Sequence, residues 1–173
     1  GQRTIDVHLS GFEAMGAVVT REGERYVTSA PQGLRGARVF MDYPSVSGTQ
    51  NVMMAATLAR GHTTIVNAAT EPEVQELANL LNGMGARISG IGSQMLEVEG
   101  VEAVHGTNAR VMPDRIETGT WAIAAVMTGG DVELNDVPTG CLDALLTRLR
   151  AAGADIEEHG NSLRVRRAGP IRA

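Results

Sequence analysis

The chain has 173 residues and a formal net charge of −5 at pH 7, with 43% hydrophobic and only 3% aromatic residues. This length allows one ordinary domain or two small ones, and the hydrophobic content excludes an intrinsically disordered chain. The acidic balance argues against a general nucleic-acid binder, and no apolar run has the length that spans a membrane. Cys141 is the single cysteine, so an internal disulfide and a cysteine metal cluster are excluded. We therefore expect a soluble cytoplasmic protein with no metal site, no cofactor, no nucleic-acid partner and no membrane partner.

The first hundred residues predict a run of short elements. Residues 5–15 carry apolar side chains on one helical face, and residues 17–20 and 25–29 flank a Glu-Gly-Glu turn that is typical of a hairpin. A complete unit follows, with a strand, a polar turn, a helix, a strand, a helix and a hairpin at residues 37–41, 42–49, 51–59, 63–67, 71–84 and 86–99.

The same order of elements is predicted again after residue 108. Here the strand, helix, strand, helix and final strand pair fall at residues 109–112, 121–127, 132–134, 142–151 and 154–166. A Gly-Ala dipeptide opens each predicted hairpin at Gly16, Gly85 and Gly153, which gives spacings of 69 and 68 residues. This regular spacing indicates a repeated supersecondary unit. The fold class is therefore α/β (α+β), with two and a half copies of a β-α-β-α-β-β unit.

The most specific motif lies between the second predicted unit's first strand and first helix. Residues 113–120 read Pro-Asp-Arg-Ile-Glu-Thr-Gly-Thr. Pro113 ends backbone pairing, and Asp114 and Thr118 by themselves indicate helix-capping residues. The whole string resembles the signature of the UDP-N-acetylglucosamine enolpyruvyl transferases, the MurA family. That resemblance implies transfer of an enolpyruvyl group from phosphoenolpyruvate to a UDP-sugar, which opens peptidoglycan synthesis and so supports cell-wall biogenesis, cell shape and cell division.

The resemblance also implies an architecture. In the enolpyruvyl transferase fold, an inside-out α/β barrel, three such units form one domain and two domains face each other across a cleft. By this resemblance residues 1–108 are the C-terminal half of the first domain, and residues 109–173 are the first repeat unit of the second. The chain would then be a fragment whose partner is the rest of the parent enzyme, and it would be inactive alone because part of the active site is missing.

Two segments resemble the family's UDP-sugar site. Arg3, Thr4 and Ile5 match the Arg-Pro-(Val/Ile)-Asp segment that holds the uracil, with Thr4 in place of the usual proline. The planar guanidinium of Arg3 suits stacking and hydrogen bonding. By itself, the position of these residues indicates only a frayed terminus.

The second segment follows a predicted strand and opens a helix, an arrangement that binds phosphate. Ser45, Val46 and Ser47 match the contacting positions of the family's Ser-Val-Gly-Ala-Thr diphosphate segment. Ser47 replaces a glycine, which predicts hindered backbone approach, and Tyr43-Pro44 replaces a Lys-Val pair. From the residues alone, a Ser/Thr helix cap is an equal interpretation.

Three charged residues complete the predicted site. Glu71 lies in an Asn-Ala-Ala-x-Glu-Pro-Glu match, where the resemblance places it near the active site, although a first-turn Glu is also favoured by the helix dipole. By the same resemblance, Asp114 would line the cleft near the reacting groups, and Arg115 would help to position anions or the closed domains. Cys141 does not align with the family's loop cysteine and is predicted to be a packing residue.

Two other functions fit parts of the pattern. The related shikimate 3-phosphate enolpyruvyl transferases share the fold, but the motifs at residues 67–73 and 113–120 favour the UDP-sugar branch. A repeat domain used only for association is the non-catalytic alternative, and it predicts no nucleotide affinity.

Overall fold

The computed structural model describes residues 4–167 and 169–172. It divides into two compact units, with the break between Ala109 and Arg110. The predicted boundary lies one residue earlier in the chain. Among the described residues, no helix is both long and apolar enough to cross a membrane.

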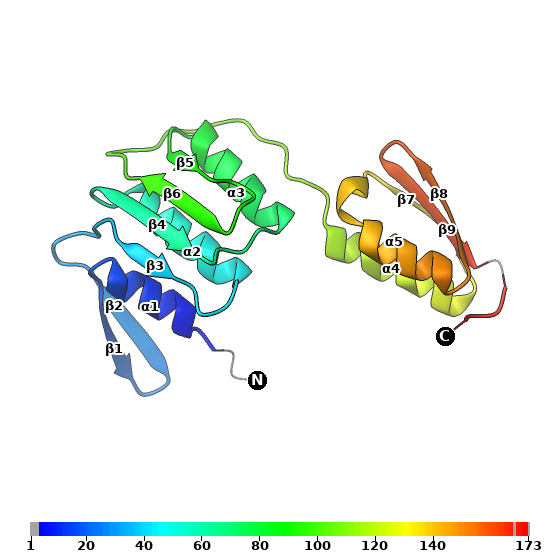
Figure 1. Cartoon of the computed structure of the whole chain (residues 1–173), viewed down its shortest axis with the longest axis horizontal. Helices are drawn as coiled ribbons and strands as arrows, with labels where there is room; N and C mark the ends of the chain where they lie inside the picture. The colour runs from blue at the N-terminus through cyan, green and yellow to red at the C-terminus, as the bar shows by residue number, and fades with distance from the viewer. Residues whose placement is uncertain (1–3, 168, 173) are drawn as a thin grey trace. The chain divides into compact units, whose positions relative to one another are not determined.

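The first unit begins with helix α1 (Asp6–Ala14) and a hairpin of β1 (Val18–Glu22) and β2 (Arg25–Ser29). The predicted full unit follows in the predicted order. Its elements are β3 (Arg38–Phe40), α2 (Val46–Thr57), β4 (His62–Val66), α3 (Pro72–Gly83), β5 (Arg87–Ser89) and β6 (Met95–Glu99). Figure 1 shows these elements in chain order.

Four strands of the first unit form one sheet in the order β3-β4-β6-β5, in which β3 and β4 are parallel and the other neighbours antiparallel. Val39, Ile65, Leu96 and Val98 turn their side chains from this sheet into the core. Val52 and Met53 of α2 and Val74 of α3 join the same core, because the helices cover one face of the sheet (Figure 1). The alternation of buried and exposed residues along β4 and β6 follows from the period of two in a half-buried strand.

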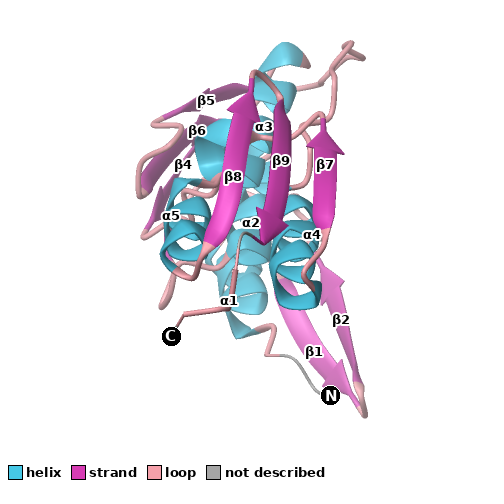
Figure 2. Cartoon of the chain, turned by 90° about the vertical axis from the view of Figure 1, so that its right-hand side faces the viewer, coloured by secondary structure: helices cyan, strands magenta, loops and turns pink. Residues whose placement is uncertain are grey.

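The second unit contains α4 (Arg115–Thr128), β7 (Asp131–Asn135), a short 3₁₀ turn at Thr139–Cys141, α5 (Asp143–Ala151), β8 (Ala154–His159) and β9 (Ser162–Arg167). Its strands form an antiparallel sheet in the order β7-β9-β8. Figure 2 shows this sheet in front of α4 and α5. Leu163 and Val165 of β9 are fully buried against Ala122 and Leu146 of the two helices.

The predicted strand at residues 109–112 is wrong. These residues belong to no strand, and the side chain of Val111 is 82% exposed. A strand needs a neighbouring strand to satisfy its backbone N–H and C=O groups. Among the described strands, β7 pairs only with β9, so residues 109–112 have no pairing partner there. Arg110 instead forms an ion pair with Asp136 at 2.6 Å, just after β7. From α2 and from α4 onward, the two units therefore share the order α-β-α-β-β. Among the described residues, only the first unit has a strand, β3, before this series.

Two predicted helices begin earlier than their apolar patterns indicate. α2 starts at Val46 instead of residue 51, and α4 starts at Arg115 instead of residue 121. In both cases a side chain caps the first turn, so polar residues that favour turns are held in the helix.

The prediction that Cys141 is a packing residue is also wrong. Its side chain is exposed in the 3₁₀ turn, and the neighbouring Leu142 fills the core instead.

Candidate substrate site

The start of α2 is fixed by Ser45. This residue is extended and its hydroxyl oxygen accepts a hydrogen bond from the Gly48 N–H at 3.1 Å. The cap leaves the N–H groups of Val46 and Ser47 without an acceptor inside the helix, because the first N–H groups of any helix lack one. Together with the helix dipole, these groups form a region that favours anions.

The side chain of Ser47 does not strain this turn. Ser47 has no left-handed backbone angle, and its hydroxyl lies 3.2 Å from Nε2 of His8 on α1. Gly48 is the position that requires a small residue, because an added Cβ would lie 2.8 Å from a methyl group of Val7. The replacement of a glycine by Ser47 therefore adds a hydroxyl to the first turn.

Glu71 lies at the same edge of the sheet as this turn. Because β3 and β4 are parallel, the helices that follow them both begin at the carboxyl ends of these strands. Glu71 is the N-cap residue of α3, but its carboxylate makes no capping hydrogen bond. Glu71 is half-buried, and its carboxylate is not used as a helix cap.

Two hydrogen bonds join the segments that carry these residues. The Thr49 hydroxyl of α2 accepts from the Ala69 N–H at 3.0 Å, and the Gln50 amide donates to the Glu73 carbonyl at 3.3 Å. Thr49 is fully buried, so its polar atom needs this partner. The first turn of α2 and the Glu71 segment are thereby held together.

The predicted uracil segment is only partly described. Arg3 lies outside the described residues, whereas Thr4 is exposed just before α1. Ile5 is half-buried, and its carbonyl accepts from the N–H groups of His8 and Leu9 at 3.0 and 3.1 Å. Ile5 therefore marks the start of α1, the helix that also carries His8.

Asp114 caps α4 in the second unit. Its Oδ1 accepts from the N–H groups of Ile116 at 2.7 Å and Glu117 at 3.2 Å, and the Thr118 hydroxyl donates to its carbonyl at 2.8 Å. Arg115, half-buried, is the first residue of the same helix. The capping role of Asp114 is thus present in the structure.

A shallow hollow of about 420 Å³ lies beside this cap. The lining includes Asp114, Glu117, Trp121, Asn135 and Asp136, so carboxylates and an indole ring share it. The Trp121 side chain is 55% exposed, which leaves its face accessible to solvent.

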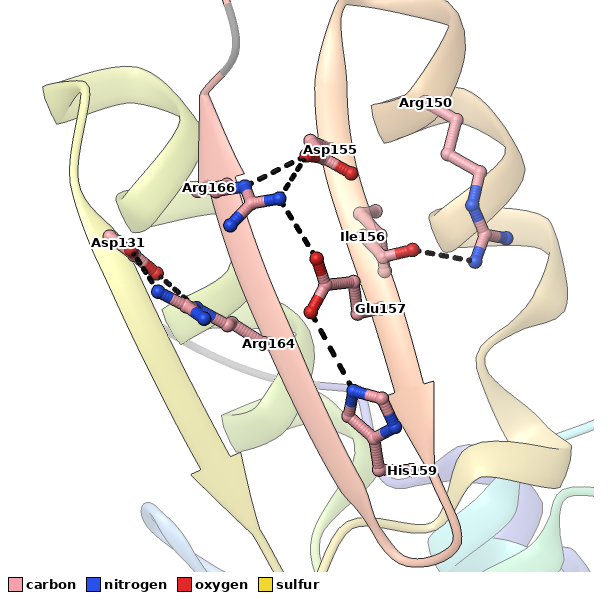
Figure 3. Close-up of polar contacts among 8 residues, drawn as sticks. All are labelled: Asp131, Arg150, Asp155, Ile156, Glu157, His159, Arg164 and Arg166. Atoms are coloured by element: carbon pink, nitrogen blue, oxygen red, sulfur yellow. Dashed lines mark hydrogen bonds and ion pairs between the residues drawn. The ribbon is translucent and has the colours of Figure 1, made fainter.

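The outer face of the second sheet carries a ladder of charges, which Figure 3 shows. Arg164 holds Asp131 through two hydrogen bonds of 2.9 and 2.7 Å, and Arg166 donates to Asp155 and Glu157 at 2.8 Å each. The hydrogen bond from Arg164 lowers the pKa of Asp131, and the bond to Asp155 raises the pKa of Arg166. These pairs stabilise charges across neighbouring strands.

A second charged contact lies on the sheet of the first unit. The Thr64 hydroxyl donates to Glu97 at 2.8 Å and lowers the pKa of that carboxyl, with a further contribution from His62. Across residues 4–167 and 169–172, no three His, Cys, Asp or Glu side chains are placed to hold a metal ion.

The sequence motifs missed one residue of the first-unit site. No predicted motif includes His8, which contacts both Ser47 and Asn51 of α2. Its position one turn after Thr4, beside the predicted uracil segment, was the available signal.

Residues 1–173 match the family described as EPSP synthase (3-phosphoshikimate 1-carboxyvinyltransferase). A UDP-N-acetylglucosamine 1-carboxyvinyltransferase from Gluconacetobacter diazotrophicus is 49% identical over 172 residues, which are 99% of this chain. The chain spans 41% of the length of that relative.

Solved structures share the fold. The enolpyruvyl transferase NikO from Streptomyces tendae matches 96% of this chain and 43% of its own, with a TM-score of 0.84 and 19% identity. An EPSP synthase from Acinetobacter baumannii matches 96% of this chain and 40% of its own, with a TM-score of 0.68 and 19% identity. The chain thus has the enolpyruvyl transferase fold, and its sequence is similar to that of a UDP-N-acetylglucosamine 1-carboxyvinyltransferase. It belongs to the EPSP synthase (3-phosphoshikimate 1-carboxyvinyltransferase) family of enzymes.

Proposed function

We propose that this chain carries part of the substrate site of an enzyme that moves the enolpyruvyl group of phosphoenolpyruvate to the 3-hydroxyl of UDP-N-acetylglucosamine and releases phosphate. The observation that carries the proposal is the 49% identity, over 99% of the chain, to a UDP-N-acetylglucosamine 1-carboxyvinyltransferase. This reaction is the first committed step of peptidoglycan synthesis, so we place the enzyme in the cytoplasm and in cell-wall biogenesis, with consequences for cell shape and division.

The reaction is an addition followed by an elimination. The sugar hydroxyl gives its proton to a base and its oxygen bonds to C2 of phosphoenolpyruvate, while an acid gives a proton to C3. The tetrahedral intermediate then loses a C3 proton to a base, and phosphate leaves as the C2–C3 double bond forms again. Such chemistry needs an acid, a base and groups that stabilise two anions. The chain spans 41% of the length of its Gluconacetobacter diazotrophicus relative, and we propose that it does not turn over alone and acts with the rest of a parent enzyme.

The first unit would bind the UDP-sugar. Ser45, Val46 and Ser47 lie in the first turn of α2, where free N–H groups favour a diphosphate. Arg3, with Thr4 and Ile5, would hold the uracil before α1.

The charged residues would serve the reacting groups. Glu71 and Asp114 each supply a carboxylate at a helix start, and Arg115 supplies a cation that suits phosphoenolpyruvate. Asp114 also caps α4, so its proposed catalytic role is additional to a structural one.

Two other functions remain candidates. The shikimate 3-phosphate transferase reaction is supported by the family match and by the Acinetobacter baumannii neighbour, but that neighbour is only 19% identical. A non-catalytic repeat domain predicts no nucleotide affinity.

Binding distinguishes these functions. The chain is titrated with UDP-N-acetylglucosamine and, separately, with shikimate 3-phosphate, and amide chemical shifts are followed by NMR. We expect UDP-N-acetylglucosamine to shift residues 45–48 in a saturable manner. Saturation by shikimate 3-phosphate alone would favour the second function, and no response to either ligand would favour the third.

A further inference from the structure

His8 joins two helices at the proposed substrate site. Its ring extends from α1, with Nε2 lying 3.2 Å from the Ser47 hydroxyl and Nδ1 lying 2.8 Å from the Asn51 side-chain amide of α2. Both contacts span about forty positions of sequence, so they result from helix packing. Gly11 allows the close approach, because a Cβ there would collide with Val52 of α2.

The two contacts determine which ring nitrogen carries the proton. The Asn51 amide nitrogen can only donate, so Nδ1 of His8 must accept. A neutral imidazole with an accepting Nδ1 carries its proton on Nε2. Nε2 therefore donates to the Ser47 oxygen.

This direction of donation affects the Ser47 hydroxyl. A hydroxyl that accepts from His8 keeps its own hydrogen available for a second bond. Ser47 is exposed at the second position of α2, where the neighbouring backbone N–H groups also lack intrahelical acceptors. The free O–H and these N–H groups thus belong to the same turn.

We propose that His8 is a positioning residue, which orients the Ser47 hydroxyl as a hydrogen-bond donor to a phosphate oxygen of the UDP-sugar bound at the start of α2. This inference rests on the proposed function and adds a specificity element to that site. The Ser47 hydroxyl is a neutral donor. It lies in the turn that follows Tyr43-Pro44, the pair that replaces Lys-Val of the MurA family. A hydrogen bond to an ionised phosphate oxygen is stronger than one between neutral groups.

The first test examines the ring itself. ¹⁵N spectra of the imidazole nitrogens in the whole chain report which nitrogen is protonated near neutral pH. We expect the Nε2–H form for His8. A neutral ring that carries its proton on Nδ1 would overturn the inference, because Nε2 could then not donate to Ser47.

The second test measures affinity in the whole chain with UDP-N-acetylglucosamine and with UDP as probes. Ser47→Ala should weaken both probes about tenfold, the order expected for a lost hydrogen bond to a charged group. His8→Leu should cause a loss of similar size. His8→Gln should restore most of it, because a glutamine amide can donate from nearly the same place.

Coupling and controls separate positioning from general damage. The double variant His8→Leu/Ser47→Ala should bind about as weakly as either single variant, since both remove the same contact. His62→Leu, at an exposed histidine on β4 of the same unit, should leave affinity unchanged. Thermal melting of each variant shows whether it is folded.

The outcomes distinguish this inference from the function on which it rests. Saturable wild-type binding with unchanged affinity in Ser47→Ala or His8→Leu would overturn the inference and leave the function standing. A loss that His8→Gln fails to restore would also overturn positioning by a donor. No wild-type binding of either probe would overturn both the proposed site and the inference.

Discussion

Replacement of Asp114 separates a helix cap from a catalytic carboxylate. Asp114 accepts from two backbone N–H groups, at 2.7 and 3.2 Å, so Asp114→Ala should lower the free energy of unfolding of the second unit by about 1 kcal/mol. Asp114→Asn retains an accepting oxygen and caps about as well. It loses only the charge that favours the helix dipole, about 0.5 kcal/mol at an exposed position.

Catalysis should follow a different order. If the carboxylate acts on the reacting groups, both variants should lose activity by about 100-fold, the order seen when one electrostatic group is removed. Stability is measured by urea unfolding of the chain. Turnover is measured as phosphate release in a chimera in which this chain replaces the 49% identical stretch of the Gluconacetobacter diazotrophicus relative.

The two measurements can each refute part of this reasoning. Wild-type turnover in the Asp114→Asn chimera would leave Asp114 as a cap only. Unchanged stability in Asp114→Ala would show that the two N–H bonds contribute little to α4. The matched control is Thr120→Ala, which removes a hydroxyl bonded to the Ile116 carbonyl on the exposed side of the same helix.

Three further predictions concern packing, charge and activity. Gly11→Ala should destabilise the first unit by about 1–3 kcal/mol in urea unfolding, because the added Cβ collides with Val52. This overpacking exceeds the gain of about 1 kcal/mol in helix propensity, and the control Ser10→Ala in the same helix should not destabilise the unit. Asp131 has a folded-state pKa below its unfolded value, so its stabilisation is present above the unfolded pKa and is lost as pH falls through the folded pKa. The stability difference between wild type and Asp131→Asn should therefore shrink on acidification. A pH-independent difference would contradict this prediction. The chain alone should not release phosphate from phosphoenolpyruvate and UDP-N-acetylglucosamine, whereas turnover on the order of 1 per second would show that its residues suffice.

The apolar patterns predicted most elements because each buries one face. The full first unit has the expected order, and Val74, Ala78 and Leu81 of α3 are buried at helical spacing. Both errors at helix starts have the same cause. Ser, Thr and Gly favour turns by propensity, yet Thr49 and Thr118 are buried and bonded in the first turns of α2 and α4.

The candidate site was predictable only where it follows from local sequence. The first turn of α2 and the cap at Asp114 lie where a strand-like segment, a polar run and a helix succeed each other. The contacts of His8 depend on the packing of α1 against α2, and its place near the predicted uracil segment does not by itself indicate them. Local patterns also could not show that residues 109–112 lack a pairing partner, since strand pairing is a non-local property.

The two units show how one backbone geometry can hold different contacts. Asn67 and Asp136, 69 positions apart, both follow the strand after the first helix and both have a left-handed backbone, with φ of 60° and 55°. The Asn67 amide donates to the Met41 carbonyl at 2.8 Å and so ties the end of β3 to the end of β4. Asp136 accepts from Arg110 at 2.6 Å and ties down an extended segment that forms no ladder. An exposed ion pair contributes less than a paired strand, so the two units share this turn although it fixes a paired strand in the first unit and an unpaired segment in the second.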